Sequence, residues 1–331
     1  MKTSRAITRY KKGKGFGYKN KAGDVTDKTT LEHIESLVIP PAWTDVEIDP
    51  SPKARVQARG HDQAGRVQAI YNPRFRAKQE RLKFDRTLRF ATKLPKLRKT
   101  LEKDLARRRF SKEKVLATIV TLIDQTYIRV GNEKYAKENN SYGVTTLRSK
   151  HTDVKGSTVT FNFIGKSGKE NTKQLTDKRI ATIIKHLDEL PGQEIFRYQD
   201  SDNKMHDIHS ADVNAYIKSI MGDEFTAKDF RTWGGTLVAT TLLIAAEYTS
   251  NEKERAKIVT SVVKETAAKL GNTPAVARSS YIDPRVIAAF HRASGMKAVR
   301  AALNDIKPRK YMSSDELRLL HLLKGRSSDN N

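Results

Sequence analysis

Apolar and polar residues alternate over short segments in the first part of the chain. The alternation predicts strands at Val46 to Ile48, Ala54 to Gly60 and Arg66 to Tyr71, with the turn HDQAG between the last two. The segment TTLEHIESL has the apolar spacing of one short helix. We therefore expect a small sheet domain from about Phe16 to Tyr71.

The pattern changes after Asn72-Pro73 to long, basic helical segments. Leucines recur there at roughly helical spacing, and Pro95 is expected to kink or break the helix. We place the domain boundary near residue 90. The expected organisation is a β-rich domain over residues 1–90 and a second domain over residues 91–331.

The second domain is expected to contain one β-hairpin among helices. In STVTFNFIG, Val159, Phe161 and Phe163 alternate with polar residues, and the turn KSGK leads into a return strand, ENTKQL. Ser111 is placed to cap the amphipathic helix KEKVLATIVTLIDQTYIRV, and Ser210 to cap a later one. The fold class is therefore α+β, with a small N-terminal sheet and a mostly helical C-terminal part.

Further helices are expected over about residues 229–249 and 251–270, the second of which stops at Gly271. Two short helices follow. Thr273 and Asp283 can cap them, each with a proline at the first helical position. Tyr281 then lies at the junction between these two helices, and only the final SSDNN segment has the composition of a disordered tail.

Charge is the strongest compositional signal. The 331 residues include 63 Lys and Arg against 38 Asp and Glu, a formal net charge of +25 that is spread along the whole chain. Such an excess favours a polyanionic partner, because self-repulsion otherwise opposes the compact state. We expect nucleic acid rather than a membrane, since no stretch has the length of a membrane span and the N-terminus lacks a secretory signal. A cytoplasmic, nucleoid-associated location follows.

The absence of cysteine excludes disulfides, thiolate metal sites and cysteine nucleophiles. The histidines and carboxylates also lack the spacing of a local metal site. GKGFG, at Gly13 to Gly17, lacks the pattern of a phosphate-binding loop, so we interpret it as a flexible basic arm. We therefore expect chemistry that uses neither a metal nor a cofactor.

Phosphoryl transfer without a metal needs three kinds of side chain. Cations must stabilise the charge of the transition state, an acid must protonate the leaving oxygen, and a nucleophile must attack in line. Arginine and lysine can serve the first two purposes, and a tyrosine phenolate can serve the third. The chain offers Arg129 in YIRVGNEKYA, Lys166 in GKSGK, Arg231 in KDFRTWGGT and Tyr281 in RSSYIDP.

These blocks resemble, in the same order, those of the type IB DNA topoisomerases, specifically the poxvirus-like form found in bacteria. The likeness runs from about Pro40 to about Ile287. It implies an enzyme that relaxes positive and negative supercoils by cutting and rejoining one strand through a 3'-phosphotyrosine intermediate, without ATP or metal. It also implies the catalytic fold shared with tyrosine recombinases, in a monomer whose two domains form a C-shaped clamp on duplex DNA.

The resemblance implies a role for each candidate residue. Tyr281 would be the nucleophile, Arg129 and Arg231 would hold the scissile phosphate, and Lys166 would protonate the departing 5'-oxygen. The chain departs from the family's pattern at Asn272, where those enzymes have a histidine. An amide can donate a hydrogen bond to a phosphate oxygen, but it cannot carry a charge or move a proton.

The resemblance also implies contacts with DNA from both domains. Gln57, Arg59 and His61, on or beside a strand of the N-terminal DNA-binding domain, would enter the major groove. Lys134 and Tyr135 would lie near phosphates in the catalytic domain. The alternative interpretation of all five is exposed polar surface.

Two other functions remain compatible with the sequence. A tyrosine site-specific recombinase shares the fold and the chemistry, but its second arginine usually follows a histidine in an H-x-x-R pattern, and here Lys228 takes that place before Arg231. A non-catalytic protein that coats duplex DNA through its phosphates would also be this basic. Relaxation of a supercoiled plasmid separates the enzyme from the coating protein.

Overall fold

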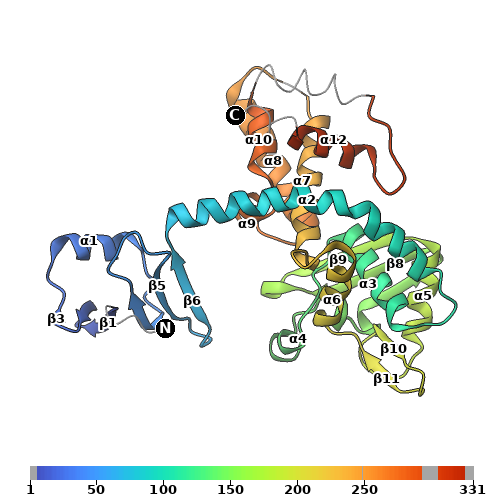
Figure 1. The fold of residues 1–331 in the computed structure, drawn as a ribbon, viewed down its shortest axis with the longest axis horizontal. Helices are drawn as coiled ribbons and strands as arrows, with labels where there is room; N and C mark the ends of the chain where they lie inside the picture. The colour runs from blue at the N-terminus through green and yellow to red at the C-terminus, as the bar shows by residue number, and fades with distance from the viewer. Residues whose placement is uncertain (1–5, 248, 293–304, 325–331) are drawn as a thin grey trace. The chain divides into compact units, whose positions relative to one another are not determined.

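A computed structural model of the chain describes residues 6–247, 249–292 and 305–324. Its elements fall into two compact units, Met1–Lys83 and Phe84–Asn331 (Figure 1). The division lies inside the long helix α2 (Pro73–Leu105), as does residue 90. The predicted tail SSDNN lies outside the described residues. The protein is thus mixed α/β, with an N-terminal antiparallel sheet and a mostly helical C-terminal part.

The N-terminal unit is built on one six-stranded antiparallel sheet of order β3-β2-β1-β4-β5-β6, with helix α1 (Lys28–Ser36) between β3 and β4 in the chain. Its strands are β1 (Ile7–Lys12), β2 (Gly15–Asn20), β3 (Gly23–Asp24), β4 (Thr44–Ile48), β5 (Val56–His61) and β6 (Val67–Tyr71). Ile34 of α1 packs with Ile7, Val46 and Ile48 in a small core. The predicted strands and helix of this region are confirmed.

The prediction that GKGFG is a flexible arm is wrong. The segment forms the turn between β1 and β2 and the start of β2, which pairs antiparallel with β1. Ile7 is buried in the core, so the sheet begins before Phe16, where the sequence pattern places its start. The Arg9 guanidinium carbon also lies 4.1 Å from the centre of the Phe16 ring, a cation–π contact that joins the two strands.

Helix α2 continues through Pro95, so of the two outcomes predicted there, a kink or a break, the break does not occur. A proline inside a helix removes one backbone hydrogen bond. Leu94 and Leu97, on either side, are fully buried, and the burial of their side chains offsets that loss.

The predicted helix after Ser111 is α3 (Lys112–Thr126), which is buried along most of its length. Ser111 occupies the N-cap position, but its hydroxyl donates to the Glu113 carboxylate at 2.6 Å instead of capping the backbone. The helix ends earlier than predicted, because Tyr127 adopts a left-handed conformation with φ 55°. The chain then passes through α4 (Glu133–Asn139), η1 (Val144–Thr146) and η2 (Ser149–His151).

The predicted hairpin is confirmed and forms two strands of a three-stranded antiparallel sheet of order β7-β8-β9. β8 (Thr158–Ile164) turns through η3 (Lys166–Gly168) into β9 (Glu170–Thr176), and β7 (Thr152–Lys155) lies on the other side of β8. Val159, Phe161 and Phe163 are buried, as the alternation predicts.

Helix α5 (Lys178–Asp188), the strand pair β10 (Arg197–Gln199) and β11 (Met205–Asp207), and helix α6 (Ser210–Met221) follow the hairpin. The N-cap of α6 is His209 rather than the predicted Ser210. The His209 N–H donates to the Asp212 carboxylate at 3.0 Å. The start of the helix is therefore held by a carboxylate of its first turn and not by a serine hydroxyl.

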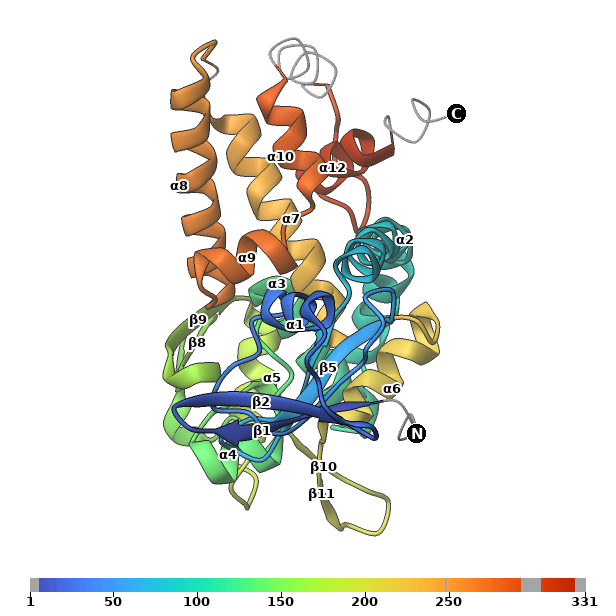
Figure 2. The same ribbon diagram turned by 90° about the vertical axis from the view of Figure 1, so that its left-hand side faces the viewer.

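The helices described after α6 are α7 (Ala227–Ala245), α8 (Glu252–Leu270), α9 (Pro274–Ser280), α10 (Pro284–His291) and α12 (Ser314–Lys324). Figure 2 shows α7 and α8 side by side, with α9 at the lower end of α8. The predicted caps are confirmed, since the Thr273 hydroxyl accepts from Val276 N at 3.3 Å and the Asp283 carboxylate accepts from Arg285 N at 2.9 Å. In the described ranges, no helix is both long and apolar enough to span a membrane.

Candidate active site

The last turn of α8 presents a group of backbone oxygens at the negative end of the helix dipole. A helix leaves its final carbonyl groups without partners inside the helix. Gly271 ends α8 with φ 61°, a left-handed conformation that favours glycine, as predicted. We call the carbonyl oxygens of Lys269, Leu270 and Gly271 the α8 carbonyl cluster. Each oxygen accepts a hydrogen bond from a cationic side chain of a different element.

Arg231 reaches the cluster from α7. It is 4% exposed; its Nη2 donates to Leu270 O at 2.7 Å, and its Nη1 donates to the carbonyl of Tyr127. Burial, and then the charge of Arg129, lower the pKa of Arg231 to about 10, so the guanidinium stays charged at neutral pH. The third donor, Nε, is buried and has no acceptor among the described residues.

Arg129 approaches the same cluster from the segment after α3. Its two terminal nitrogens lie 3.5 and 3.4 Å from Gly271 O, and Nη2 also donates to Asn272 Oδ1. Burial lowers the pKa of Arg129, and the proximity of Tyr281 opposes that shift. The two arginines thus share one short stretch of backbone at the end of α8.

Asn272 follows the Gly271 cap, and the oxygen and the nitrogen of its side-chain amide have different environments. Oδ1 accepts from Arg129, which leaves Nδ2 on the other side of the amide. That Nδ2 is buried and, within the described part of the chain, has no hydrogen-bond partner. Buried donors normally have a partner, so Nδ2 of Asn272 and Nε of Arg231 mark a place where an acceptor would be stabilised.

Three residues, Tyr281, Ile282 and Asp283, lie between α9 and α10, and we call them the hinge. The Thr236 hydroxyl of α7 lies 3.1 Å from Tyr281 O and accepts from Asp283 N at 3.1 Å. Gly235 permits this approach, because a Cβ there would lie 2.8 Å from Tyr281 O. The centre of the half-buried Tyr281 ring lies 5.2 Å from the guanidinium carbon of Arg231. The structure therefore brings Tyr281 together with Arg129, Arg231 and Asn272.

Lys166 is not brought into this group. It lies in the exposed η3 turn at the tip of the hairpin, where Ser167 and Gly168 have positive φ values of 65° and 70°. The tip is closed by a hydrogen bond from Gly165 N to Lys169 O at 2.7 Å.

Lys173 of β9 is the cation that the sequence analysis missed. It is 9% exposed, and its Nζ donates to Lys269 O in the α8 carbonyl cluster. Burial, followed by the charges of Arg231 and Arg129, lowers the pKa of Lys173 to about 8. A signal was present in the sequence: in the predicted hairpin Lys173 pairs with Phe161, so it must face the same side as that buried ring.

The residues predicted to contact DNA from the N-terminal unit have different environments. Arg59 is exposed on β5, and His61 ends that strand with Nδ1 3.4 Å from an Asp45 carboxylate oxygen. The expectation that Gln57 is available to a groove is wrong for this structure, since Gln57 is 1% exposed and its amide donates to the carbonyls of Ser51 and Ala54. The register shifts between Val56 and Ala58, and this bulge turns Gln57 inward.

Lys134 and Tyr135 lie together in the first turn of α4. Asn132 caps this helix by accepting from Tyr135 N at 3.2 Å. Lys134 is exposed, and its Nζ lies 3.9 Å from Oε1 of Glu138. The Tyr135 side chain is also exposed. Both side chains are accessible on this surface.

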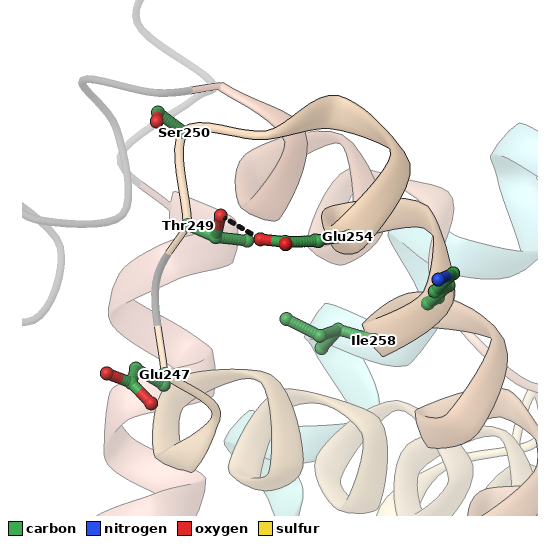
Figure 3. Close-up of a pocket in the computed structure, with 6 residues that line it drawn as sticks. Glu247, Thr249, Ser250, Glu254 and Ile258 are labelled. Carbon is green, nitrogen blue, oxygen red and sulfur yellow. Dashed lines mark hydrogen bonds between the residues drawn. The ribbon is translucent and has the colours of Figure 1, made fainter.

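A separate hollow of about 690 Å³ lies where α7 leads into α8 (Figure 3). Its lining includes Glu247, Thr249, Ser250, Glu254, Lys257 and Ile258. From Ile258, the last lining residue on α8, to Lys269 of the carbonyl cluster the helix rises by roughly 17 Å at about 1.5 Å per residue. The two glutamates of the hollow disfavour phosphate, so we do not regard it as the site. No group of three or more His, Asp or Glu that could hold a metal ion occurs among residues 6–247, 249–292 and 305–324.

The chain is similar over most of its length to known DNA topoisomerases. A family model described as the catalytic core of eukaryotic DNA topoisomerase I matches residues 72–307, and one described as the N-terminal domain of bacterial DNA topoisomerase IB matches residues 15–62. DNA topoisomerase 1B of Acanthamoeba polyphaga mimivirus is 35% identical over 80% of this chain and 84% of the viral protein. DNA topoisomerase 1B of Vaccinia virus (strain Copenhagen) is 24% identical over 84% of this chain and 88% of its own.

Proposed function

We propose a mechanism from one premise: the chain belongs to the type IB DNA topoisomerases, since the catalytic-core model matches residues 72–307 and the mimivirus relative is 35% identical over 80% of the chain. It is therefore a DNA topoisomerase, an isomerase whose substrate is duplex DNA. The proposal concerns how its residues carry out the reaction. We infer that Tyr281 cuts one strand by forming a 3'-phosphotyrosine bond and that reversal of this step reseals the strand.

The observation that carries this proposal is the pair of buried donors beside Tyr281. Nε of Arg231 and Nδ2 of Asn272 have no acceptor among the residues that the structure describes, although donors of this kind are normally satisfied. A phosphate oxygen is the acceptor that DNA would supply. We propose that the scissile phosphate binds against Arg129, Arg231 and Asn272, within reach of the Tyr281 hydroxyl.

In the proposed cleavage, the phenol oxygen of Tyr281 bonds to phosphorus, the bond from phosphorus to the 5'-oxygen breaks, and the phenol proton passes to solvent. The guanidinium groups of Arg129 and Arg231 stabilise the negative charge that builds on the non-bridging oxygens. One ester bond forms for each one that breaks. Resealing therefore needs no ATP, and no step requires a metal ion.

Lys166 is the proposed acid for the departing 5'-oxygen. Its ammonium group can give up a proton as the oxygen leaves and regain one afterwards. The exposed position of the η3 turn supports an arrangement in which DNA draws the hairpin tip towards the scissile phosphate. Lys166 would then join the other catalytic side chains only when DNA is bound.

We further propose that the two units act together as a C-shaped clamp on the duplex, and that the C-terminal unit, Phe84–Asn331, has the catalytic fold shared with tyrosine recombinases. Arg59 and His61 would contact DNA from the N-terminal unit, and Lys134 and Tyr135 from the catalytic unit. The net charge of +25 supports binding through several phosphates. A single copy would suffice for relaxation, so we propose a monomer that acts at the nucleoid.

The proposal predicts full relaxation of supercoiled plasmid in the presence of a chelator and without a nucleotide. Each catalytic group that we name is an organic side chain, so removal of divalent ions should leave the rate almost unchanged. Agarose-gel relaxation assays on positively and negatively supercoiled plasmid, with and without EDTA, measure this. Activity that disappears in EDTA and returns with magnesium would contradict the mechanism.

Asn272→Ala is predicted to slow single-turnover cleavage on the order of 10²-fold, because one transition-state donor is lost. Asn272→Asp is the matched variant, since it keeps the oxygen that accepts from Arg129 but removes the Nδ2 donor. Both variants should be slow in rapid-quench assays on a suicide duplex. If Asn272→Ala cleaves as fast as the wild type, the Nδ2 donor does not act on phosphate.

A further inference from the structure

One face of β9 is polar although it is buried. Asn171 and Lys173 are 8% and 9% exposed, and they pair across the hairpin with the buried Phe163 and Phe161. Burial of an ammonium group costs free energy unless its hydrogen bonds are satisfied, so a lysine beside these rings destabilises the fold unless its ammonium group has partners. We therefore expect the ammonium group of Lys173 to have a function that an apolar side chain could not perform.

These two side chains join the hairpin of β8 and β9 to the last turn of α8. The Lys173 ammonium donates to Lys269 O, in the α8 carbonyl cluster. Asn171 lies against the Gly271 cap, where a Cβ would come within 2.3 Å of Asn171 Oδ1. At its other end the Asn171 amide donates to Lys169 O at 2.8 Å, close to the hairpin tip. The strand that leads from Lys166 therefore packs directly on the turn that carries Asn272.

We infer that Lys173 is a positioning residue for DNA cleavage: its charged ammonium group holds the last turn of α8 and the hairpin together, so that Asn272 and the arginines keep their geometry. The inference rests on the function proposed above, since it concerns the same site. Lys173 acts through Lys269 O and need not touch the DNA. It supplies the third cation of the α8 carbonyl cluster, after Arg129 and Arg231.

The charge of Lys173 is sensitive to pH in the range where the enzyme can be assayed. The charged groups that act on it are Arg129, after α3, and Arg231, on α7; from α8 it faces the Lys269 carbonyl, and across the hairpin the uncharged Phe161. Burial and these two cations lower its pKa to about 8. The ammonium form is therefore present below about pH 8 and is lost above it, and a neutral amine binds a carbonyl less strongly than an ammonium group does.

The test is the ratio of wild-type to Lys173→Met cleavage rates from pH 6.5 to 9.5, measured in single turnovers on a suicide duplex. We expect a ratio on the order of 10-fold to 10²-fold at pH 7, because a small displacement of catalytic groups has effects of this size. The ratio should fall as pH rises through 8, since the wild type then loses the charge that the variant lacks. Ionisation of other groups affects both proteins and cancels in the ratio.

Lys155→Met is the matched control, because Lys155 is an exposed lysine on β7 of the same sheet. The ratio of the wild-type to the Lys155→Met cleavage rate should be close to one at every pH. If Lys173→Met does not fold, as judged by circular dichroism and duplex binding, Lys173→Gln takes its place with the same expectation. A ratio of one, or a ratio that does not change with pH, would overturn the inference. Failure of the wild type to form a covalent adduct would instead overturn the proposed function.

Discussion

Tyr281→Phe should form no covalent adduct with DNA and should relax no supercoils, with a loss of at least about 10⁴-fold in cleavage rate. The substitution removes one hydroxyl and keeps the ring whose centre lies 5.2 Å from the Arg231 guanidinium carbon. The backbone contacts of the hinge with Thr236 are unaffected, because they involve main-chain atoms of Tyr281 and Asp283. Affinity for uncut duplex should therefore stay close to that of the wild type.

The adduct is measured by denaturing gel after mixing with a 5'-labelled duplex, since labelled DNA attached through its 3'-phosphate then migrates with the protein. Tyr198→Phe is the matched control, because it removes a phenol hydroxyl from β10 in the same unit. The control should form the adduct at the wild-type rate. A covalent complex formed by Tyr281→Phe would show that another residue is the nucleophile.

Arg231→Ala should slow cleavage on the order of 10³-fold or more, a larger loss than that of Asn272→Ala. The change removes a charge together with the unpaired Nε donor that we propose for the phosphate, and charge stabilisation dominates in a buried site. Arg231→Lys keeps the charge but not the planar fork of donors, so it should recover only part of the rate. Rapid-quench cleavage of a suicide duplex at saturating enzyme separates these effects on chemistry from effects on binding.

A loss of folding must be distinguished from a loss of catalysis in Arg231→Ala. Arg231 donates to Leu270 O and to the Tyr127 carbonyl, and an unsatisfied buried carbonyl costs about 1–3 kcal/mol. Thermal unfolding should therefore show a lower Tm, while duplex binding at low temperature persists. Arg318→Ala, which breaks a 2.9 Å ion pair with Asp315 on α12, should lower stability slightly and leave cleavage unchanged. Wild-type cleavage by Arg231→Ala would remove Arg231 from the mechanism.

Local patterns in the sequence were sufficient for the hairpin and for the ends of several helices. Thr273, Asp283 and Gly271 act through hydrogen bonds or backbone conformations within a few residues, so their roles could be predicted without a fold. The alternation of Val159, Phe161 and Phe163 likewise predicts which face of the hairpin is buried.

What the sequence could not supply depends on contacts between distant segments. The meeting of Arg129, Arg231 and Lys173 on one turn of α8 requires the packing of elements that lie far apart in the chain. The burial of Gln57 cannot be predicted from the alternation, because a bulge shifts the alternation by one residue and short patterns do not reveal bulges. The candidate residues were found through their motifs, whereas their partners became visible only in the fold.

The α8 carbonyl cluster engages, in the free protein, donors that a phosphate would need. A phosphate that takes an Nη donor from Arg129 or Arg231, in addition to the unpaired Nε of Arg231 and Nδ2 of Asn272, releases a backbone oxygen, so that hydrogen bond is partly cancelled by the one lost. We expect this exchange to lower the ground-state affinity for the scissile phosphate. The extra charge of the transition state exceeds what a carbonyl dipole can match, so the arginines still favour that state strongly. Under the proposed mechanism, we therefore expect intact and resealed strands to be held less tightly at this position than the transition state is.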